Sequence, residues 1–298
     1  MLRQLKGILL LLITTMIWGL SFVAQRTSVD AIEAFTFNTG RMCSAFVTMV
    51  IIVAIRYSRD KSGIGPAVRF RERDVIIGGL LCGAALFAGN ACMQIGIMTT
   101  GAGKTGFETA LYIIEVPLFG MLTGQKPRKV LWLCVALALT GLWLLAVRPG
   151  ESMALARGDV ILFIGTVFFA LQIMFMDHYV KKADPFAIST VQMAVGAVLF
   201  PICMMLFEEP DWSSFTGELV PMLYAGVMAS AVGFTLAAFA QRTVDPTVTS
   251  LVMSLEGVFA VIGGWLIIDE YMTIRELLGC ALMFTAIIIT QLPKRSTC

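Results

Sequence analysis

The sequence predicts an all-α membrane protein in which ten transmembrane helices form two inverted five-helix repeats. Three observations lead to this fold class: a low content of charged residues, ten long apolar segments, and a similarity between the two halves of the chain. Of the 298 residues, 58% are hydrophobic and 14% are charged, whereas a soluble domain usually carries about 25% charged residues. Because so few charges cannot cover the surface of a soluble protein of this size, we expect the lipid bilayer to surround the chain.

The apolar segments have about the length that an α-helix needs to cross a bilayer, roughly 20 residues. In chain order they are 7–25, 32–55, 75–98, 102–124, 130–147, 159–177, 185–207, 218–240, 246–268 and 275–292. The first follows Arg3 and Lys6, as the apolar part of a signal peptide would. It is longer than is typical of such a part and lacks a convincing cleavage site, so we interpret it as a membrane span.

The basic residues lie mainly on one side of these spans. If both termini face that side, the opposite side holds only four of the Lys and Arg residues in the loops and termini, namely Arg26, Arg148, Arg157 and Arg275. Cytoplasmic loops are enriched in Lys and Arg. We therefore predict a multi-pass protein of a cell membrane, of the bacterial inner membrane type, with both termini in the cytoplasm.

The two halves of the chain are similar to each other. EAFTFNTGRM at 33–42 matches DPFAISTVQM at 184–193, and weaker matches follow in the same order. We expect one repeat in residues 1–147 and the other in residues 148–298, each with five helices. Because five is odd, the second repeat would be inverted in the membrane. Inverted repeats recur in transporters, although a duplicated bundle without transport activity would have the same pattern.

Carboxylates occur inside the predicted spans. Glu115 and Glu256 match each other between the halves, and Glu108 lies two helical turns from Glu115. A charged acid at the centre of a bilayer costs about 2.5–3.5 kcal/mol, so each should face protein or a water-filled cavity. Three interpretations stay open: a structural hydrogen bond, binding of a cationic or amine-bearing solute, and proton uptake. Glu115 and Glu256 are the proton-coupling candidates.

Other polar and aromatic residues are candidates for lining a solute cavity. The spacing of Lys104, Glu108, Tyr112 and Glu115 indicates one stripe on a helix. Arg41 could form an ion pair with Glu108 or Glu115, or bind a substrate carboxylate. The remaining candidates either line the cavity or form hydrogen bonds between helices: Trp18, Asn90, Gln94, Gln172 and Gln192.

Two glycine pairs, Gly79 with Gly83 and Gly120 with Gly124, have the small-xxx-small spacing of close helix contacts. No sequence motif indicates a nucleotide, a cofactor, a metal or a catalytic nucleophile. The seven cysteines follow no regular spacing, so they predict neither a disulfide framework nor a zinc site. We interpret the lone His178 as an interfacial residue. Because the basic residues form no single patch, we expect no nucleic-acid partner, and the sequence indicates no oligomeric state.

Five stretches resemble the EamA-type branch of the drug/metabolite transporter superfamily: IWGLSFVAQR (17–26), FTFNTGRM (35–42), CMQIGIMTTGAGKTGFETALYIIEVP (92–117), SLEGVFAVIGGWLIIDEYMT (254–273) and LLGCAL (277–282). The resemblance covers nearly the whole chain. It implies ten helices in two inverted EamA-like repeats, a central solute cavity, and export or exchange of small metabolites such as amino acids, often linked to protons.

The resemblance also concerns single residues. Trp18, Arg41, Gln94, Gln192 and Glu256 stand where that family has such residues, and Glu270 matches an acidic residue with a structural role that closes the ninth span. Glu108 and Glu115 depart from the pattern, because the family is usually aliphatic there. These two additional acids favour an amine-bearing or cationic solute.

The sequence therefore predicts a secondary active transporter, an exporter or exchanger, for a small polar metabolite such as an amino acid or organic amine. It would work by alternating access, with a proton as a candidate coupling ion, and would not be an enzyme. One alternative is a membrane scaffold or sensor that keeps the transporter fold without transport. Another is an intramembrane enzyme, which would need a nucleophile and a base paired on facing spans.

Overall fold

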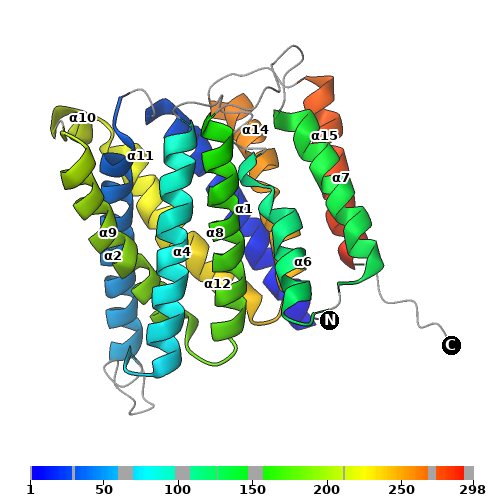
Figure 1. Ribbon diagram of the computed structural model, residues 1–298, viewed down its shortest axis with the longest axis horizontal. Coiled ribbons are helices and arrows are strands. Elements are labelled where there is room, and N and C mark those ends of the chain that lie inside the picture. Colours follow the sequence, from blue (N-terminus) through cyan, green and yellow to red (C-terminus); the bar gives the residue numbers. More distant parts are fainter. Residues whose placement is uncertain are drawn as a thin grey trace.

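The computed structural model describes residues 2–28, 31–59, 70–97, 108–125, 127–146, 157–210, 212–267 and 273–291. In these residues all regular secondary structure is helical, as Figure 1 shows. The first half contains α1 (Leu2–Ser28), α2 (Ala34–Ser58), α4 (Arg73–Ile97), α6 (Tyr112–Leu122) and α7 (Lys129–Ala146). The second half contains α8 (Arg157–Tyr179), α9 (Pro185–Phe207), α10 (Trp212–Gly217), α11 (Leu219–Leu223), the π-helix η1 (Tyr224–Gly233), α12 (Phe234–Gln241), α13 (Pro246–Met253), α14 (Glu256–Ile267) and α15 (Ile274–Gln291).

Within the described residues, seven helical segments are long and apolar enough to cross a membrane. Two of them are composite: Leu219–Gln241 joins α11, η1 and α12, and Pro246–Ile267 joins α13 and α14. The predicted class, an all-helical membrane protein, is confirmed. Of the other predicted spans, 102–124 contains α6, while 130–147 and 275–292 cover all but the first residue of α7 and of α15. Lys104 and Glu270 lie outside the described residues.

The outward faces of the helices are apolar. Leu122, Met205 and Ile274 are 83%, 76% and 80% exposed, and half-exposed apolar side chains occur along α1, α2 and α9. In water such an apolar surface would cause the protein to aggregate, whereas in a bilayer it would contact lipid tails. The chain therefore presents apolar side chains both to its core and to its surroundings, as membrane helices do.

The helices lie side by side in a flat bundle. In Figure 1, α2 and α9 form one edge, α7 and α15 form the other, and α1, α4, α6 and α8 lie between them. Small residues allow close approach: a Cβ at Gly83 would lie 2.7 Å from Cβ of Val195 on α9. The predicted contact at Gly79 and Gly83 is therefore confirmed. The prediction for Gly120 and Gly124 is wrong, since Gly124 has a φ of 85° after the end of α6 and no neighbour within 4 Å of an added Cβ.

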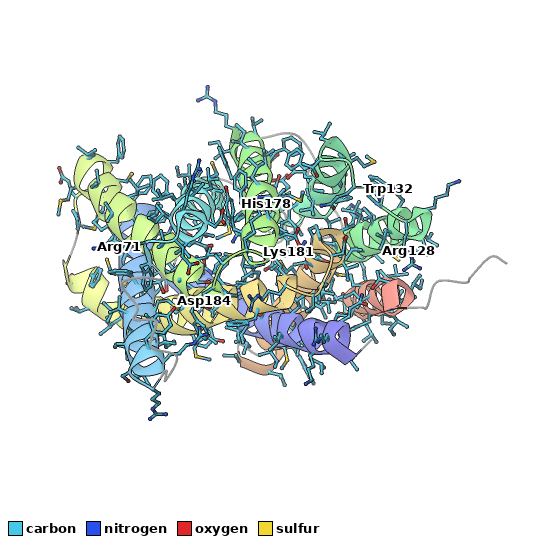
Figure 2. The ribbon with its side chains drawn as sticks, turned by 90° about the horizontal axis from the view of Figure 1, so that it is seen from below. Arg71, Arg128, Trp132, His178, Lys181 and Asp184 are labelled. Carbon is cyan, nitrogen blue, oxygen red and sulfur yellow. The ribbon has the colours of Figure 1, made fainter. Side chains whose placement is uncertain are left out.

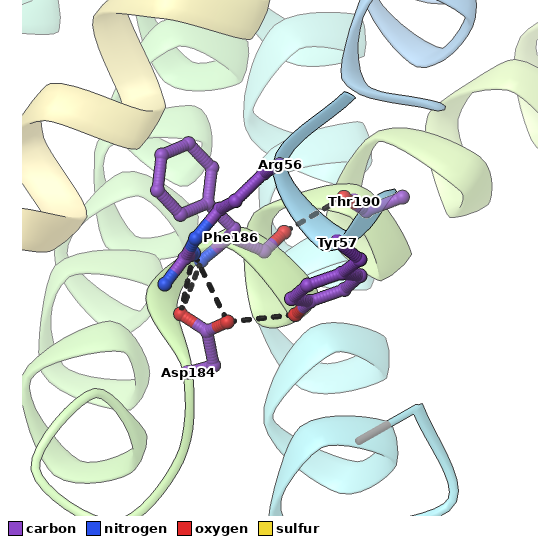
Figure 3. Close-up of polar contacts among 5 residues, drawn as sticks. All are labelled: Arg56, Tyr57, Asp184, Phe186 and Thr190. Carbon is purple, nitrogen blue, oxygen red and sulfur yellow. Dashed lines mark hydrogen bonds and ion pairs between the residues drawn. The ribbon is translucent and has the colours of Figure 1, made fainter. Parts of the chain in front are cut away.

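Carboxylates join α2 and α9 at both ends of this antiparallel pair. Asp184 caps the start of α9 and accepts hydrogen bonds from Arg56 and Tyr57 at the end of α2, as Figure 3 shows. At the other end, Glu208 follows α9 and accepts from the backbone N–H groups of Phe35 and Thr36 in the first turn of α2. The start of α9 is thus capped by its own Asp184, and the start of α2 is capped by Glu208 from the end of α9.

Basic residues gather at the end of the bundle where α1, α4 and α7 begin. Figure 2, seen from below, places Arg71, Arg128, His178 and Lys181 around this end. His178 lies in the last turn of α8, beside Lys182, whose Nζ is 2.7 Å from its Nε2 atom. This position at a helix end agrees with the interfacial role that the sequence predicts for the histidine.

Candidate functional site

A cavity of about 70 Å³ lies in the middle of the bundle. One water needs roughly 10–15 Å³ by the same measure, so the cavity has room for several waters or a solute of a few heavy atoms. Six of the ten predicted site residues line it: Trp18, Arg41, Asn90, Tyr112, Gln172 and Glu256. They come from six different helices, α1, α2, α4, α6, α8 and α14. The rest of the lining is mostly apolar or aromatic: Phe22, Met93, Phe169, Ile173, Ala229, Phe234 and Met253.

Sequence reasoning missed three polar residues of the lining, Ser21, Gln25 and Thr109. Ser21 and Gln25 lie three and seven positions after Trp18 in α1, and therefore on the same face of that helix. The amide of Gln25 donates to the Ser21 hydroxyl at 3.3 Å. The helical spacing from Trp18 was the signal that could have found both residues.

Two helices are interrupted beside the cavity, and the two interruptions have the same geometry. In the first half Leu111 N–H donates to Glu108 O, three residues back, before α6 begins at Tyr112. In the second half Leu255 N–H donates to Val252 O before α14 begins at Glu256. A hydrogen bond to the carbonyl oxygen three residues earlier, as in a 3₁₀-helix, tightens the helix locally and changes the direction of the side chains that follow.

The interruptions place Tyr112 and Glu256 in corresponding positions of the two halves, each as the first residue of its helix. Across a sequence separation of 144 residues, the Tyr112 hydroxyl donates a hydrogen bond of 3.2 Å to Oε1 of Glu256. The sequence match between the halves pairs Glu256 with Glu115. In the structure, Tyr112 has the position in its helix that Glu256 has in α14, and Tyr112 is also the residue that contacts Glu256. Glu256 is 8% exposed.

Arg41 contributes a buried guanidinium to the same cavity. Its Nε donates to the Ser230 hydroxyl at 2.8 Å, and an Nη atom lies 3.5 Å from Oδ1 of Asn90. The sequence left open an ion pair with Glu108 or Glu115. Among the described residues no carboxylate forms an ion pair with Arg41, so the structure does not contain that pair.

The other predicted residues are buried but do not line the cavity: Gln94, Glu108, Glu115 and Gln192. Oε1 of Glu115 accepts from the Thr166 hydroxyl of α8 at 2.8 Å. Glu115 follows Tyr112 by three residues in α6 and is rotated from it by about 60°, and it contacts Thr166 of α8 instead of the cavity. Gln192 accepts a hydrogen bond of 3.2 Å from Gln172 and thereby lies behind a lining residue.

The arrangement places one cation and one carboxylate on a single cavity with largely apolar walls. In the described part of the chain, no group of three or more His, Cys, Asp or Glu residues could hold a metal ion. A solute that carries both an anionic and a cationic group could contact Arg41 and Glu256 together. Apolar parts of the solute would contact the aromatic side chains.

Comparisons with known proteins agree with this architecture. The model of the EamA-like transporter family matches residues 5–147 and again residues 156–292. An uncharacterised transporter of Archaeoglobus fulgidus is 24% identical over 294 residues, which are 97% of this chain and 87% of the relative. The uncharacterised transporter YoaV of Bacillus subtilis is 21% identical over 94% of each chain. The uncharacterised inner membrane transporter YedA of Escherichia coli K12 is 22% identical over 93% of this chain and 88% of its own.

The fold occurs in a solved structure as well. One crystal structure matches with a TM-score of 0.80 over 96% of each chain at 14% identity, which shows a shared fold. The names of the curated relatives describe transporters rather than enzymes. With family matches over both halves of the chain, this multi-pass membrane protein belongs to the EamA-like transporter family.

Proposed function

We propose that this protein transports a small zwitterionic metabolite, an amino acid, whose carboxylate binds Arg41 and whose ammonium group binds Glu256. The observation that carries the proposal is the presence of these two opposite charges on one buried cavity, without an ion pair between either of them and another described residue. A zwitterion supplies a counter-charge to each.

The energetics favour such a solute. A charged group inside a bilayer costs a few kcal/mol unless it is paired or hydrated. Arg41 is 5% exposed and its contacts are neutral. The guanidinium group is planar and binds a carboxylate through two parallel hydrogen bonds. An organic amine, the other substrate class that the sequence suggests, would pair with Glu256 and leave Arg41 without an anion.

Transport would proceed by alternating access between two inverted repeats. The double match to the family model supports repeats in residues 1–147 and 148–298, and seven of the predicted spans coincide with described helical segments long and apolar enough to cross a membrane. The equivalent interruptions before Tyr112 and Glu256 support the same interpretation. Interrupted helices at the interface of inverted repeats recur as solute sites in transporters.

The proposal includes the orientation and the driving force. The basic end of the bundle would face the cytoplasm together with both termini. Glu256 would exchange its proton for the ammonium group of the solute, which links export or exchange to the proton gradient. Of the two proton-coupling candidates, Glu115 contacts Thr166 and lies off the cavity, so the proposal assigns the proton exchange to Glu256.

The test is uptake and counterflow in proteoliposomes that contain the purified protein. Labelled amino acids are compared with the amines that lack the carboxylate and with the acids that lack the ammonium group, with and without a pH gradient. We expect flux of amino acids, with amines and acids at least tenfold weaker, since one lost ion pair of about 1.4 kcal/mol corresponds to a factor of ten. Equal flux of amines and amino acids would contradict the proposed role of Arg41.

Two variants test which of the two charged residues binds the carboxylate of the solute and which binds its ammonium group. Arg41→Gln should remove the preference for a carboxylate, and Glu256→Gln should remove the preference for an ammonium group. Arg242→Gln is the matched control, because Arg242 contacts the backbone oxygen of Val180 and does not line the cavity. If none of the compounds crosses the membrane at any pH, the transport proposal is refuted and the scaffold alternative gains support.

A further inference from the structure

A π-helix interrupts the membrane-spanning segment Leu219–Gln241. The element η1 covers ten residues, Tyr224–Gly233. Most π-helices are single turns, and they occur frequently at functional sites because the wider spiral moves side chains and backbone groups out of the α-helical pattern. Six of its residues are buried, among them Gly226, Ala229 and Ser230. The position and length of η1 therefore call for a physical reason.

Ser230 connects η1 to the cavity through Arg41. Its hydroxyl donates to the backbone oxygen of Ala225, five residues earlier, at 2.9 Å. A hydroxyl has one proton to donate, so the Ser230 oxygen is left as an acceptor, and it accepts from Nε of Arg41 at 2.8 Å. Ser230 is completely buried. The Ala225 contact thus fixes the direction in which Ser230 presents its lone pair to the arginine.

The same element contacts the backbone of Arg41. A Cβ at Gly226 would overlap with the side-chain oxygen of Ser44 and the backbone oxygen of Arg41. Only a glycine at this position lets η1 approach α2 so closely. One element therefore fixes both the start of the Arg41 side chain and its Nε atom.

A second residue of the cavity is held by η1 as well. The indole Nε1 of Trp18 donates to the backbone oxygen of Ala229 at 2.8 Å. A Cβ at Gly233 would lie 2.6 Å from that Nε1 atom. Trp18 and Arg41 both line the cavity, so η1 supports two walls of the site although it contributes little of the lining itself.

We propose that Ser230 is a specificity-determining positioning residue, which holds the guanidinium of Arg41 so that its Nη atoms face the carboxylate of the transported solute. This inference rests on the proposed function. When Nε is engaged by Ser230, the edge formed by the two Nη atoms is available for a paired contact with a carboxylate. Without the hydroxyl, Arg41 can rotate, and the preference for a carboxylate falls even though the charge is still present.

The test compares Ser230→Ala with the conservative variant Ser230→Thr. In proteoliposomes, KM and kcat are measured for the best amino acid, and the inhibition constant is measured for the amine that lacks its carboxylate. We expect Ser230→Ala to raise KM for the amino acid about tenfold with little change in kcat, and to change the inhibition constant of the amine less than twofold. Ser230→Thr keeps the hydroxyl and should stay within threefold of the parent for both. An equal change for amine and amino acid, or no change for either, would overturn the inference.

A double-variant cycle supplies the second measurement. Ser230→Ala in the background of Arg41→Gln should have no further effect on the ratio of amino acid to amine, because the residue acts only through Arg41. Additive effects of the two substitutions would show independent roles and refute the inference. Measurements on the parent protein separate the proposed function from the role of Ser230. If the parent has no preference for a carboxylate, the proposed function is refuted. If the parent has this preference and Ser230→Ala leaves it intact, only the role of Ser230 is refuted.

Discussion

Replacing Asp184 by asparagine or by alanine should separate the contribution of its negative charge from that of its capping hydrogen bond at the contact between α2 and α9. Asp184 caps α9 by accepting from Phe186 N–H at 3.3 Å, and it binds the end of α2 through Arg56 at 3.1 Å and Tyr57 at 2.7 Å. The guanidinium of Arg56 also lies 4.3 Å from the ring centre of Phe186, and Figure 3 draws these two side chains beside Asp184. Asparagine keeps an oxygen for the cap and for Tyr57 but removes the negative charge.

The expected magnitude follows from these contacts. The Arg56 side chain is 38% exposed, so its ion pair with Asp184 contributes about 0.5 kcal/mol. A hydrogen bond to a charged group is roughly twice as strong as a neutral one, so the bond from Tyr57 loses about 1 kcal/mol in the asparagine variant. Alanine also removes the cap, about 1 kcal/mol, and the neutral remainder of the Tyr57 bond, about 1 kcal/mol. We expect losses of about 1.5 kcal/mol for Asp184→Asn and about 3.5 kcal/mol for Asp184→Ala.

The assay is thermal unfolding of the purified protein in detergent. At about 2 °C per kcal/mol, Tm should fall by about 3 °C for asparagine and about 7 °C for alanine. Asp245 gives a matched control, because it caps α13 by accepting from Thr247 N–H at 2.9 Å in the same Asp-Pro arrangement. Asp245→Asn should shift Tm by less than about 1 °C, since asparagine and aspartate cap equally well. Equal Tm values for the two Asp184 variants would refute the separation into charge and cap.

Further predictions concern the buried acids and the glycine contacts. Glu256→Gln should lower amino acid uptake into proteoliposomes at least tenfold, because it removes the counter-charge for the solute. Glu115→Gln should change uptake less than threefold, since Glu115 lies off the cavity and the amide can still accept a hydrogen bond; equal losses in the two variants would contradict the assignment. Gly83→Ala should destabilise the protein by about 1–3 kcal/mol in thermal unfolding, because the added Cβ would be 2.7 Å from Val195 Cβ. Gly217→Ala, where an added Cβ meets nothing within 4 Å, should have little effect, and a similar loss there would exclude the packing explanation.

The fold class could be predicted from the sequence because it depends on composition along the chain. The transfer of an apolar segment of about 20 residues from water to lipid is favourable, whichever segments surround it in the fold. Seven described helical segments are long and apolar enough to cross a membrane, and each coincides with a predicted span, including the first one. The same local reasoning identified polar residues inside the spans, since buried charges are costly in any arrangement. Trp18, Arg41 and Glu256 lie on the cavity as that reasoning expected.

The relation between particular residues required the tertiary structure. Sequence spacing places Glu108, Tyr112 and Glu115 on one continuous helical stripe, but the α-helical hydrogen-bond pattern is interrupted between Glu108 and Tyr112. The interruption turns Tyr112 toward Glu256 and leaves Glu115 in contact with α8. A change of helix geometry at one or two residues alters the direction of all later side chains, and no periodicity in the sequence records it.

Arg41 shows the same division between local and tertiary information. By itself the sequence determined that a guanidinium lies inside a membrane span and must have a partner. Only the tertiary structure decided that the partners within the protein are the amide oxygen of Asn90 and the hydroxyl of Ser230, from a π-helix 189 residues away along the chain. Burial and charge are properties of a residue and its segment, whereas the choice of a partner depends on which helix faces which, and packing fixes that arrangement across the whole bundle.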